Sequence, residues 1–492
     1  MTRRNFMKTS ASLIAGISCV CSQSNQSLKK SSKSPNLLVV FPDQMRAQTL
    51  EFMGEDPCIT PSLNRFAKQS LVLNQAVSNF PLCSPFRAMF MTGQYPHANG
   101  VLGNCNTHAA EHGYELKEDA RCWSDILKDN GYELGYIGKW HLDAPHRPYI
   151  NTSNNTQDFA WNEWTPPHRR HGFDFWYGYG TYDRHTRPMY WTTQASRSEF
   201  HYVHQWGPEH EADMAACFLQ NKEGRYRDPK KPFVLVVSMN PPHMPYQLVP
   251  QKYIDRYNHL SLEQLCRRPN IPPSGTKWGD YYRKHIKNYL AMVTGVDEQF
   301  GRILDVLKTE GLENNTLVLF MSDHGNCLGI HDQISKNNHY EESMRVPFLL
   351  RWPGHIKPRC EDLLLSSPDI FPTLLDLMGF HNQIPSYVQG KSHSRLFLEN
   401  KGTRPSSQLY LHIPYGHPGL GRRGVRTLTH TLMVSRMPDQ NQRIVLHDNQ
   451  KDPYQLKNIA KEKSSLVNKL VHKELIPWLK RTRDPWVKSW NL

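Results

Sequence analysis

Short apolar runs rich in β-branched residues recur along the chain, and stretches with a helix-like mixture of polar and apolar residues separate them. Five of these runs are predicted to form strands, at residues 36–41, 134–137, 232–239, 316–321 and 346–351. Strands that alternate with helices along a chain are typical of an α/β sandwich whose central sheet is largely parallel. The pattern therefore predicts an α/β fold of this kind.

Polar side chains follow each of the first four runs directly. They are Asp43-Gln44, Lys139-Trp140-His141, Asn240-Pro241-Pro242-His243 and Asp323-His324. In open α/β sheets, ligands bind beyond the carboxyl ends of the strands. We therefore expect the four strand ends to converge on one site.

The stretch from about residue 143 to residue 197 is rich in aromatic residues, His, Arg, Asn and Thr, and it shows little periodicity. These features predict a long insertion near the mouth of the site. Two interpretations are equally open for it. Either the insertion contacts substrate, or it is a surface excursion held in place by its aromatic side chains.

The character of the sequence changes near Gly390. Beyond it come a linker-like segment, a basic loop predicted at Gly421-Arg422-Arg423-Gly424, a strand-like run at residues 443–447 and a helix-like tail at residues 464–481. We predict a large domain at residues 36–385 and a smaller C-terminal α+β domain at residues 390–492.

Cys83 lies at the predicted start of a helix, with Pro85 near that start and Gly93 near the end, as helix capping favours. The helix dipole and the free N–H groups of the first turn favour an anion there, and Arg87 faces the same way. A thiolate nucleophile fits this setting, since both features depress the pKa of a cysteine. A buried, inert cysteine is the alternative that the short motif leaves open.

The composition is that of a globular chain, with 38% of the 492 residues hydrophobic and 21% charged, which is enough for a sizeable core. The formal net charge of +14 favours polyanionic ligands such as sulfated glycans or nucleic acid. Because no long Lys/Arg run marks a binding stripe, the charge is equally compatible with a role in solubility. We predict no nucleic-acid partner.

Residues 1–25 resemble a twin-arginine signal peptide. Arg3 and Arg4 are followed by Phe6 and Lys8, and then by a mildly apolar stretch at residues 11–20. This predicts a protein that the twin-arginine export machinery carries to the periplasm or the medium. A lipid anchor at Cys19 or Cys21 is an alternative, although the residues before each fit a lipobox poorly. No later segment is long and apolar enough to span a bilayer.

The cysteines give no sign of a structural framework. Ten are present, and setting aside Cys19, Cys21 and Cys83 leaves an odd number, seven, with no C-x-x-C spacing among them. Neither a zinc ribbon nor a disulfide framework is therefore predicted.

Several motifs together resemble one enzyme family. They are Cys83-x-Pro85-x-Arg87 running into Thr92-Gly93, Gly138-Lys139-Trp140-His141, Pro242-His243-Met244-Pro245, Ser322-Asp323-His324-Gly325, Lys336, Tyr340-Glu341 and Arg345-Val346-Pro347. In this order the chain resembles the formylglycine-dependent sulfatases of the alkaline-phosphatase superfamily, over roughly residues 36–380 and weakly through 446–456. The resemblance implies an alkaline-phosphatase-like sandwich and an active sulfuric ester hydrolase.

The resemblance also implies that a maturase converts Cys83 into formylglycine. In such enzymes the aldehyde is hydrated, so that one hydroxyl attacks sulfur and the other remains available. Deprotonation of the second hydroxyl collapses the sulfated hemiacetal to aldehyde and sulfate, and no water needs to attack the covalent intermediate.

By match to the family, Asp43, Gln44, Asp323 and His324 would bind a divalent cation that activates the diol. Gln44 and His324 stand where many relatives carry Asp and Asn, so calcium is the first choice and manganese stays open. The implied catalytic residues are Cys83, Arg87, Lys139, His141, His243 and Lys336. Among them Arg87, Lys139 and Lys336 would hold residue 83 and the sulfate. His141 would assist elimination of sulfate, and His243 would protonate the leaving oxygen.

Five residues of the insertion are candidates for binding the sugar, because hydroxyl and carboxylate groups need directional partners. They are Asp143, Arg147, His171, Arg184 and His185. No motif of the family supports them, and each is equally readable as an exposed loop residue or a member of a structural ion pair.

Three functions follow from this reading. The first is hydrolysis of a sulfate ester on a glycan, with algal polysaccharides and glycosaminoglycans both open as substrates. The second is a phosphonate monoesterase or phosphodiesterase, because related formylglycine enzymes share the cysteine motif and an Asp-Gln with Asp-His metal set. The third is an inactive relative that binds sulfated polysaccharide, against which the intact set of catalytic residues argues.

Overall fold

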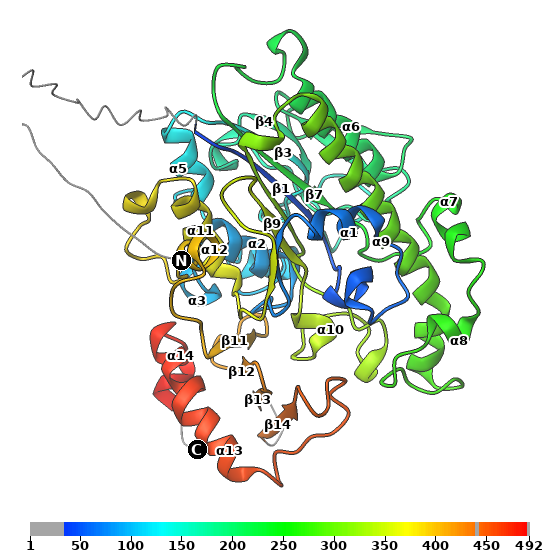
Figure 1. The fold of residues 1–492 in the computed structure, drawn as a ribbon, viewed down its shortest axis with the longest axis vertical. Helices are drawn as coiled ribbons and strands as arrows, with labels where there is room; N and C mark the ends of the chain where they lie inside the picture. Colours follow the sequence, from blue (N-terminus) through cyan, green and yellow to red (C-terminus); the bar gives the residue numbers. More distant parts are fainter. Residues whose placement is uncertain (1–33, 438–441, 490–492) are drawn as a thin grey trace, which may run out of the picture. The chain divides into compact units, whose positions relative to one another are not determined.

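The computed structural model describes residues 34–437 and 442–489, and its largest element is a ten-stranded sheet (Figure 1). In spatial order the strands are β10 (Arg359–Glu361), β2 (Leu71–Leu73), β9 (Phe348–Arg351), β8 (Thr316–Met321), β1 (Asn36–Pro42), β7 (Phe233–Met239), β3 (Glu133–Lys139), β4 (Phe175–Tyr179), β5 (Met189–Thr192) and β6 (His201–Tyr202). The neighbours from β8 to β4 all pair in parallel, whereas β8–β9, β2–β9, β4–β5 and β5–β6 are antiparallel. The predicted α/β fold with a largely parallel sheet is confirmed.

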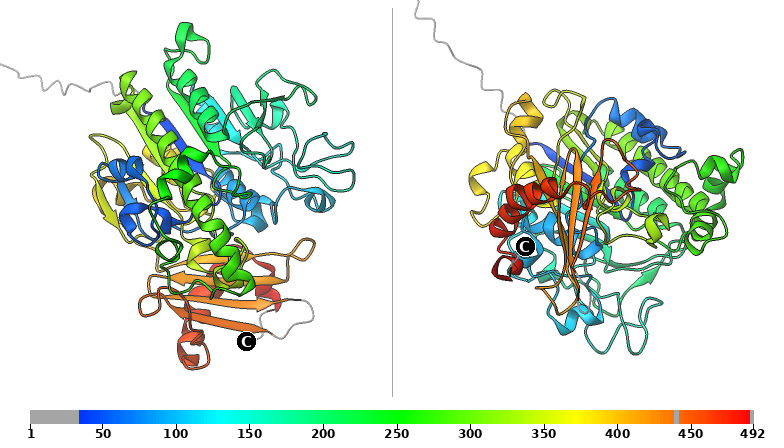
Figure 2. Two further views of the ribbon diagram at one scale, coloured as in Figure 1. Left: turned by 90° about the vertical axis from the view of Figure 1, so that its right-hand side faces the viewer. Right: turned by 90° about the horizontal axis from the view of Figure 1, so that it is seen from below.

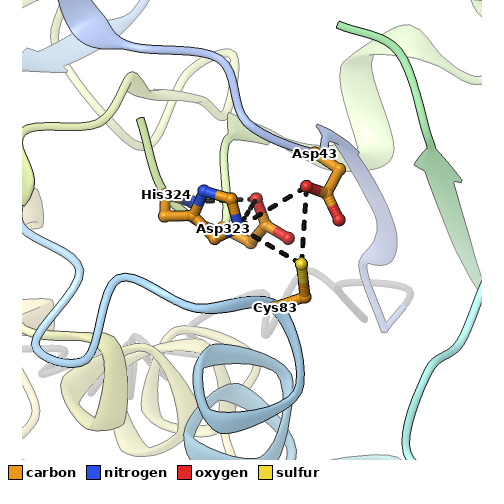
Figure 3. Close-up of side chains that lie close together, drawn as sticks. All are labelled: Asp43, Cys83, Asp323 and His324. Atoms are coloured by element: carbon orange, nitrogen blue, oxygen red, sulfur yellow. Dashed lines mark hydrogen bonds and ion pairs between the residues drawn. The ribbon is translucent and has the colours of Figure 1, made fainter. Parts of the chain in front are cut away.

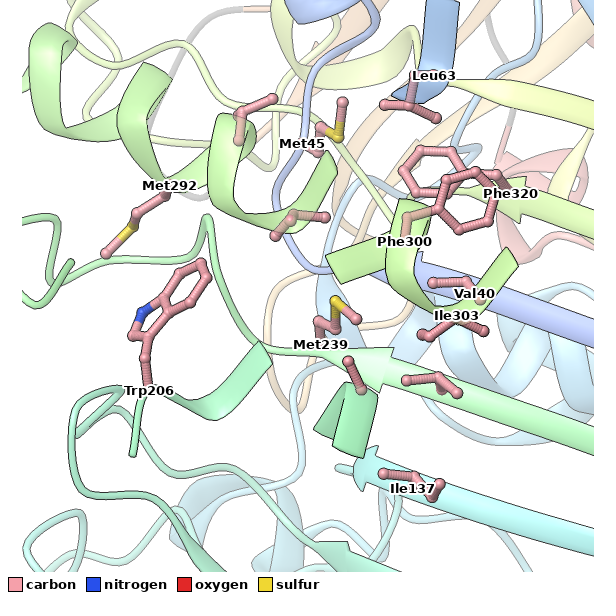
Figure 4. Packing of buried hydrophobic residues seen from close by; sticks show 14 of the residues in the cluster. Val40, Met45, Leu63, Ile137, Trp206, Met239, Met292, Phe300, Ile303 and Phe320 are labelled. Atoms are coloured by element: carbon pink, nitrogen blue, oxygen red, sulfur yellow. The ribbon is translucent and has the colours of Figure 1, made fainter. Parts of the chain in front are cut away.

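The apolar runs in the sequence reflect strands that are buried on both faces. In β1, Leu38 and Val40 belong to one buried cluster, and the alternate residues Leu37 and Val39 belong to another. The first cluster packs under α6 (Gly207–Gln220) and α9 (Lys277–Thr309); Figure 4 shows part of it. The second packs under α2 (Cys83–Thr92), α5 (Trp123–Asp129) and α11 (Ile370–Leu377). Helices on both sides hold the sheet and fix its carboxyl edge.

The predicted insertion at residues 143–197 is wrong in part, because β4 and β5 lie within it and extend the sheet. The run that forms β4 consists of aromatic residues and one glycine. Gly178 sits where an added Cβ would lie 3.0 Å from the Gly138 carbonyl oxygen, so the glycine permits the parallel pairing with β3. The segments around these strands remain loops.

A second, four-stranded antiparallel sheet follows near the C-terminus, in the order β11 (Ser407–His412), β12 (Gly421–Thr427), β13 (His430–Arg436) and β14 (Arg443–Asp448). After it come α13 (Ser464–Leu470), a π-helical turn at Val471–Leu475 and α14 (Ile476–Arg481), which Figure 2 shows in red beside the orange strands. The strand-like run and the helical tail are therefore present. The exact bounds 36–385 and 390–492 stay a prediction.

The basic loop expected at residues 421–424 is wrong, since this run is the first half of β12. Gly424 pairs with Tyr410 and Met433, and a Cβ at this position would lie 2.2 Å from the Leu432 carbonyl oxygen. Arg423 is fully buried and paired with Asp484 at 2.5 Å. A strand that buries a paired arginine lacks the apolar alternation from which strands are predicted.

The C-terminal sheet contacts the segment that leads into α2. The Asn79 side-chain amide donates to the Leu409 carbonyl at 2.7 Å, and the Leu411 amide donates to the Asn79 carbonyl at 2.7 Å. Phe80 and Met89 belong to the same buried cluster as residues of β11 and β13. The C-terminal sheet therefore supports the helix that carries Cys83.

The predicted export signal at residues 1–25, with Cys19 and Cys21, lies outside the described residues. Among residues 34–437 and 442–489, no helix is long and apolar enough to cross a membrane. The eight cysteines in this part of the chain are all free thiols.

Candidate active site

Cys83 is the first residue of α2 and is only 1% exposed. The helix ends at Gly93, whose φ of 65° is a conformation that glycine adopts without strain. The Ser84 hydroxyl donates to the His141 carbonyl at 2.7 Å, and the Ser84 amide donates to the Asn104 side chain at 3.1 Å. The first of these bonds ties the start of the helix to the segment that follows β3.

Two neighbouring strands bring the acidic residues together, as Figure 3 shows. Val40 of β1 pairs with Phe320 of β8, and each stands three residues before an aspartate, Asp43 and Asp323. The His324 Nε2 atom lies 3.5 Å from Asp43 Oδ1 and 3.7 Å from Asp323 Oδ1. These three side chains and the Cys83 sulfur each offer one donor atom within 4.8 Å of the others.

The cysteine sulfur lies at the edge of this cluster. Cys83 Sγ is 3.3 Å from His324 Nε2 and 3.7 Å from Asp43 Oδ1. The Lys336 ammonium is 3.4 Å from the sulfur, and the Lys139 ammonium is 3.9 Å from it. Residue 83 therefore sits between the acidic cluster and two cations.

Gln44 joins the cluster through its side-chain carbonyl. Its oxygen accepts from Lys336 Nζ at 2.7 Å, its side-chain nitrogen donates to the Tyr246 hydroxyl at 3.1 Å, and its backbone amide donates to Asp323 Oδ1 at 3.0 Å. The backbone φ of 70° is a left-handed conformation that costs a residue with a side chain about 1–2 kcal/mol. Such strain is typical of positions where a side chain is aimed for function.

The donors fit a divalent cation. They are two carboxylates, an amide carbonyl and an imidazole, all buried, and a hard-oxygen set with one nitrogen suits calcium or manganese. Burial raises the pKa of Asp323, and the neighbouring Asp43 carboxylate raises it further. Two carboxylates whose oxygens lie within 4.8 Å of each other are stable together as anions when a cation offsets their charge.

Arg87 and Lys139 connect the acidic cluster to the other strand ends. Arg87 Nη2 lies 3.2 Å from both Asp43 Oδ2 and Asp323 Oδ2, and its Nη1 donates to the Ser238 hydroxyl at 2.8 Å. Lys139 Nζ lies 2.7 Å from Asp43 Oδ2. Lys139 Nζ also donates to the Asn240 side chain at 3.1 Å, so all four predicted strand-end clusters meet at one place.

The charges around Cys83 favour an anion at this position. Burial alone would raise the pKa of the thiol, and so would Asp43. The cations Lys139 and Lys336 outweigh both effects and hold that pKa well below its usual value. Electrostatics of this kind stabilise negative charge on whichever group occupies position 83.

His141 is arranged as a base. Its Nε2 faces the Cys105 carbonyl at 3.1 Å, and because a carbonyl only accepts, Nε2 carries the proton and Nδ1 is left with a free lone pair. Nδ1 is buried without a hydrogen-bond partner in the described part of the chain. Burial lowers the pKa of His141, although Cys83 opposes this effect. A neutral imidazole close to residue 83 is therefore available to take a proton.

His243 has the opposite setting. Its Nδ1 lies 2.7 Å from the Met244 carbonyl oxygen and 3.4 Å from Asp183 Oδ1, two groups that only accept. Burial would raise the pKa of Asp183, but the hydrogen bond and charge of His243 lower it. Because both groups only accept, Nδ1 of His243 carries a proton. The two histidines therefore differ in their hydrogen bonding, since Nδ1 has no partner in His141 among the described residues and faces two acceptors in His243.

The five predicted sugar-binding residues have different surroundings. Asp143 accepts from Arg169 Nε and from the Thr165 hydroxyl, both at 2.6 Å. His171 Nδ1 lies 3.5 Å from Asp125, and the Arg147 guanidinium lies 4.9 Å from the Tyr149 ring. His185 Nε2 lies 2.8 Å from the His243 carbonyl oxygen. Arg184 is exposed. Any role of these residues with substrate stays a prediction.

The sequence interpretation assigned no role to Asn240 or Asp183. The Asn240 side-chain carbonyl accepts from Lys139 Nζ at 3.1 Å, and its amide donates to Asp183 Oδ1 at 3.1 Å. Asn240 opens the polar run after β7, so its position was a usable signal. Asp183 had none, because it lies in a loop whose path only the fold determines.

Comparison with known proteins identifies the chain. The family model described as Sulfatase matches residues 35–380, a range that includes every residue of this centre. The chain belongs to the sulfatase family. A second model, for the C-terminal region of N-sulphoglucosamine sulphohydrolase, matches residues 329–481 of this sulfatase. The predicted resemblance is confirmed, and the protein is a sulfuric ester hydrolase.

Similar proteins cover nearly the whole sulfatase. An endo-4-O-sulfatase of Bacteroides thetaiotaomicron is 39% identical over 487 residues, 92% of this chain and 93% of the relative. A solved structure of a candidate sulfatase from Bacteroides fragilis is 46% identical, covers 93% of this chain and 98% of its own, and has a TM-score of 0.90. Another, from work on glycosaminoglycan metabolism by B. thetaiotaomicron, is 38% identical over 93% and 98%, with a TM-score of 0.86.

Proposed function

We propose that this sulfatase removes sulfate from a sulfated glycan and that its nucleophile is formylglycine made from Cys83 by a maturase. The observation that carries the proposal is the position of the Cys83 sulfur, 3.3 Å from His324 and 3.4 Å from Lys336 at the edge of a buried acidic cluster. A hydrated aldehyde at this position supplies one hydroxyl to attack sulfur and a second whose deprotonation releases sulfate.

Asp43, Gln44, Asp323 and His324 would hold a divalent cation, calcium or alternatively manganese, which supplies Lewis acidity for the sulfuryl oxygens. The protein's own cations complement it. Lys139 and Lys336 flank residue 83 and stabilise the negative charge that develops on the sulfuryl group. Arg87 forms ion pairs with Asp43 and Asp323 and so offsets part of the negative charge near the nucleophile.

The two histidines divide the proton transfers. His243, whose Nδ1 faces Asp183, gives a proton from Nε2 to the oxygen of the leaving sugar. His141, neutral and with Nδ1 free, takes a proton from the group at position 83 in the step that releases sulfate. An alkoxide is a poor leaving group, so the acid matters most for glycan sulfates.

Two observations support a glycan substrate. The relative named endo-4-O-sulfatase and the structure connected with glycosaminoglycan metabolism are similar to this chain over more than nine tenths of its length. We infer that a 4-O-sulfated glycosaminoglycan is the substrate. The Arg3-Arg4 motif supports export by the twin-arginine machinery to the periplasm or the medium, where such polymers are met.

The experiment that tests the proposal measures sulfate release from sulfated oligosaccharides by the purified, matured enzyme and by Cys83→Ala. We expect the alanine variant to lose turnover while its melting temperature stays within a few degrees, because one small side chain is removed. Mass spectrometry of the peptide containing residue 83 reports the conversion. Substantial sulfatase activity of Cys83→Ala would refute the formylglycine assignment.

A paired assay separates the phosphonate alternative. An aryl sulfate and an aryl phosphonate monoester with the same leaving group report the preference for the transferred group directly. We expect the sulfate to have the higher kcat/KM. A preference for the phosphonate by orders of magnitude would replace the sulfatase proposal.

A further inference from the structure

A groove beside the two catalytic histidines has no assigned role. It encloses about 670 Å³ and is formed by the insertion, by the loop after β7 and by the start of α9. Its lining includes Asn154, Trp161, Arg184, Gln247 and Tyr281. Because Arg184 is the residue that distinguishes it, we name it the Arg184 groove.

The Arg184 groove is continuous with the reaction centre. Asp183, which contacts His243, and Met244, which follows that histidine, both belong to its lining. The ring of Trp161 lies 6.4 Å from the ring of His141. A group that is bonded to the leaving oxygen would therefore extend from His243 into the groove.

Arg184 is a cation without a protein partner. Its side chain is exposed and forms no hydrogen bond or ion pair with any residue in ranges 34–437 and 442–489. The other charged residues that were predicted to bind the sugar have protein partners. Asp143 forms an ion pair with Arg169, and Arg147 lies over the Tyr149 ring. The Asp183 carboxylate, also in the lining, is engaged by Asn154 at 2.9 Å as well as by His243. The groove thus presents one free guanidinium.

The remaining lining suits a pyranose ring. Trp161 and Tyr281 are partly exposed aromatic side chains, and such surfaces pack against the apolar faces of sugars. Gln247 offers an amide group at the same surface, whereas the Asn154 amide is bonded to Asp183. A planar guanidinium matches a planar carboxylate through two parallel hydrogen bonds.

We propose that the Arg184 groove binds a uronate sugar that neighbours the sulfated sugar, with Arg184 paired to its carboxylate. The proposal rests on the proposed glycan sulfatase function and specifies it, since it makes a polymer of alternating uronate and sulfated hexosamine the preferred substrate. Trp161 and Tyr281 contribute ring contacts, and Arg184 contributes the discrimination between acidic and neutral neighbours.

The test uses a tetrasaccharide that carries one 4-O-sulfated hexosamine beside a uronate, the same compound with its carboxylates reduced to alcohols, and an aryl sulfate. Wild type, Arg184→Ala and Arg184→Lys are compared. Arg187→Ala is the matched control, because Arg187 is exposed three residues further on, stacks 4.7 Å from the Tyr202 ring and does not line the groove. Melting temperatures verify that each variant is folded.

We expect carboxyl reduction to lower the kcat/KM of wild type by roughly 10- to 100-fold, the value of a charge-assisted pair of hydrogen bonds. Arg184→Ala should lose a similar factor on the intact tetrasaccharide, lose much less on the aryl sulfate, and no longer respond to carboxyl reduction. The kcat/KM of Arg184→Lys on the intact tetrasaccharide should lie between those of wild type and Arg184→Ala. Arg187→Ala should behave as wild type.

Two results would overturn the proposal. One is an equal response of wild type and Arg184→Ala to carboxyl reduction, and the other is a rate that depends on a second sulfate and not on the carboxylate. Failure of the proposed function appears differently, as no sulfate release from either tetrasaccharide. In that case calorimetric binding of both compounds to Cys83→Ala still decides, because equal dissociation constants for the intact and reduced forms would exclude the uronate contact.

Discussion

Replacement of Asp183 by Asn tests the proposed role of His243 as the proton donor to the leaving group. Asp183 Oδ1 lies 3.4 Å from His243 Nδ1, and the Asp183 side chain is 33% exposed. Two unit charges at that distance interact by about 5 kcal/mol at an effective dielectric constant of ~20 and by about 1 kcal/mol in bulk water. Because water reaches Asp183, we take ~1–2 kcal/mol as the interaction energy between Asp183 and a charged His243, which corresponds to roughly 5- to 30-fold in rate.

The loss should appear only where protonation of the leaving group limits the rate. The Met244 carbonyl still orients the imidazole of Asp183→Asn, so the variant removes charge and leaves the geometry. We expect kcat/KM to fall roughly 5- to 30-fold on a glycan sulfate, whose leaving group is an alkoxide, and to change little on an aryl sulfate.

The control is Asp158→Asn, which removes the same charge from an exposed position of the same insertion. Steady-state kinetics on both substrates and melting temperatures are measured for all three proteins. Equal losses of Asp183→Asn on the two substrates would refute the reasoning, and so would an unchanged rate on the glycan sulfate.

Three further predictions concern the buried charges. Calcium at 100 times its dissociation constant should stabilise wild type by about 2.7 kcal/mol in a thermal scan, and equal stabilisation of Asp323→Asn would contradict the site. Burial raises the pKa of Glu211 to about 8, so its neutral form belongs to the folded state, and the stability it contributes below pH ~4.5 is lost as pH rises through 8. Glu211→Gln should therefore exceed wild type in unfolding free energy at pH 9, by on the order of 3 kcal/mol, and match it at pH 4; parallel pH profiles in urea titrations would disprove this. Burial would raise the pKa of Glu342, but Arg268 holds it well below its usual value. The stability that this ion pair contributes is therefore present above the unfolded pKa of about 4.3 and is lost as the pH falls through the pKa of the folded state. Glu342→Gln should cost about 3 kcal/mol at pH 7 and nothing in strong acid, and a difference that is independent of pH would count against the pair.

The sequence predicted that the polar strand ends would meet, because parallel strands end at a common edge. The polar residues after β1 and β8 stand at the same offset from paired residues, Val40 and Phe320, so the fold class alone implies that Asp43 and Asp323 meet. Cys83 joined them through the resemblance of its motif to the sulfatases, and the capping pattern of α2 placed it correctly at a helix start.

What the sequence did not predict depends on long-range contacts. β4 was not predicted because it lies in an aromatic segment without strand periodicity. Its pairing with β3 depends on the close approach of Gly178 to Gly138, and a periodic pattern does not reveal such a contact. β12 was read as a loop because its Arg423 is buried through a distant partner, Asp484. Asp183 reaches His243 through the path of a loop, and residue type alone did not separate it from its neighbours.

The contacts of the C-terminal sheet with Asn79 and Phe80 bear on the timing of maturation. Cys83 is 1% exposed in the folded chain, and β11, which is made more than 300 residues later, bonds to Asn79 just before it. Under the proposed conversion of Cys83 to formylglycine, a maturase that recognises the segment around Cys83 must act before this segment is buried. Folding and modification would then compete, and a chain that folds first would keep Cys83 buried and unmodified. Variants that slow the docking of β11 should accordingly yield a larger converted fraction when the maturase is scarce.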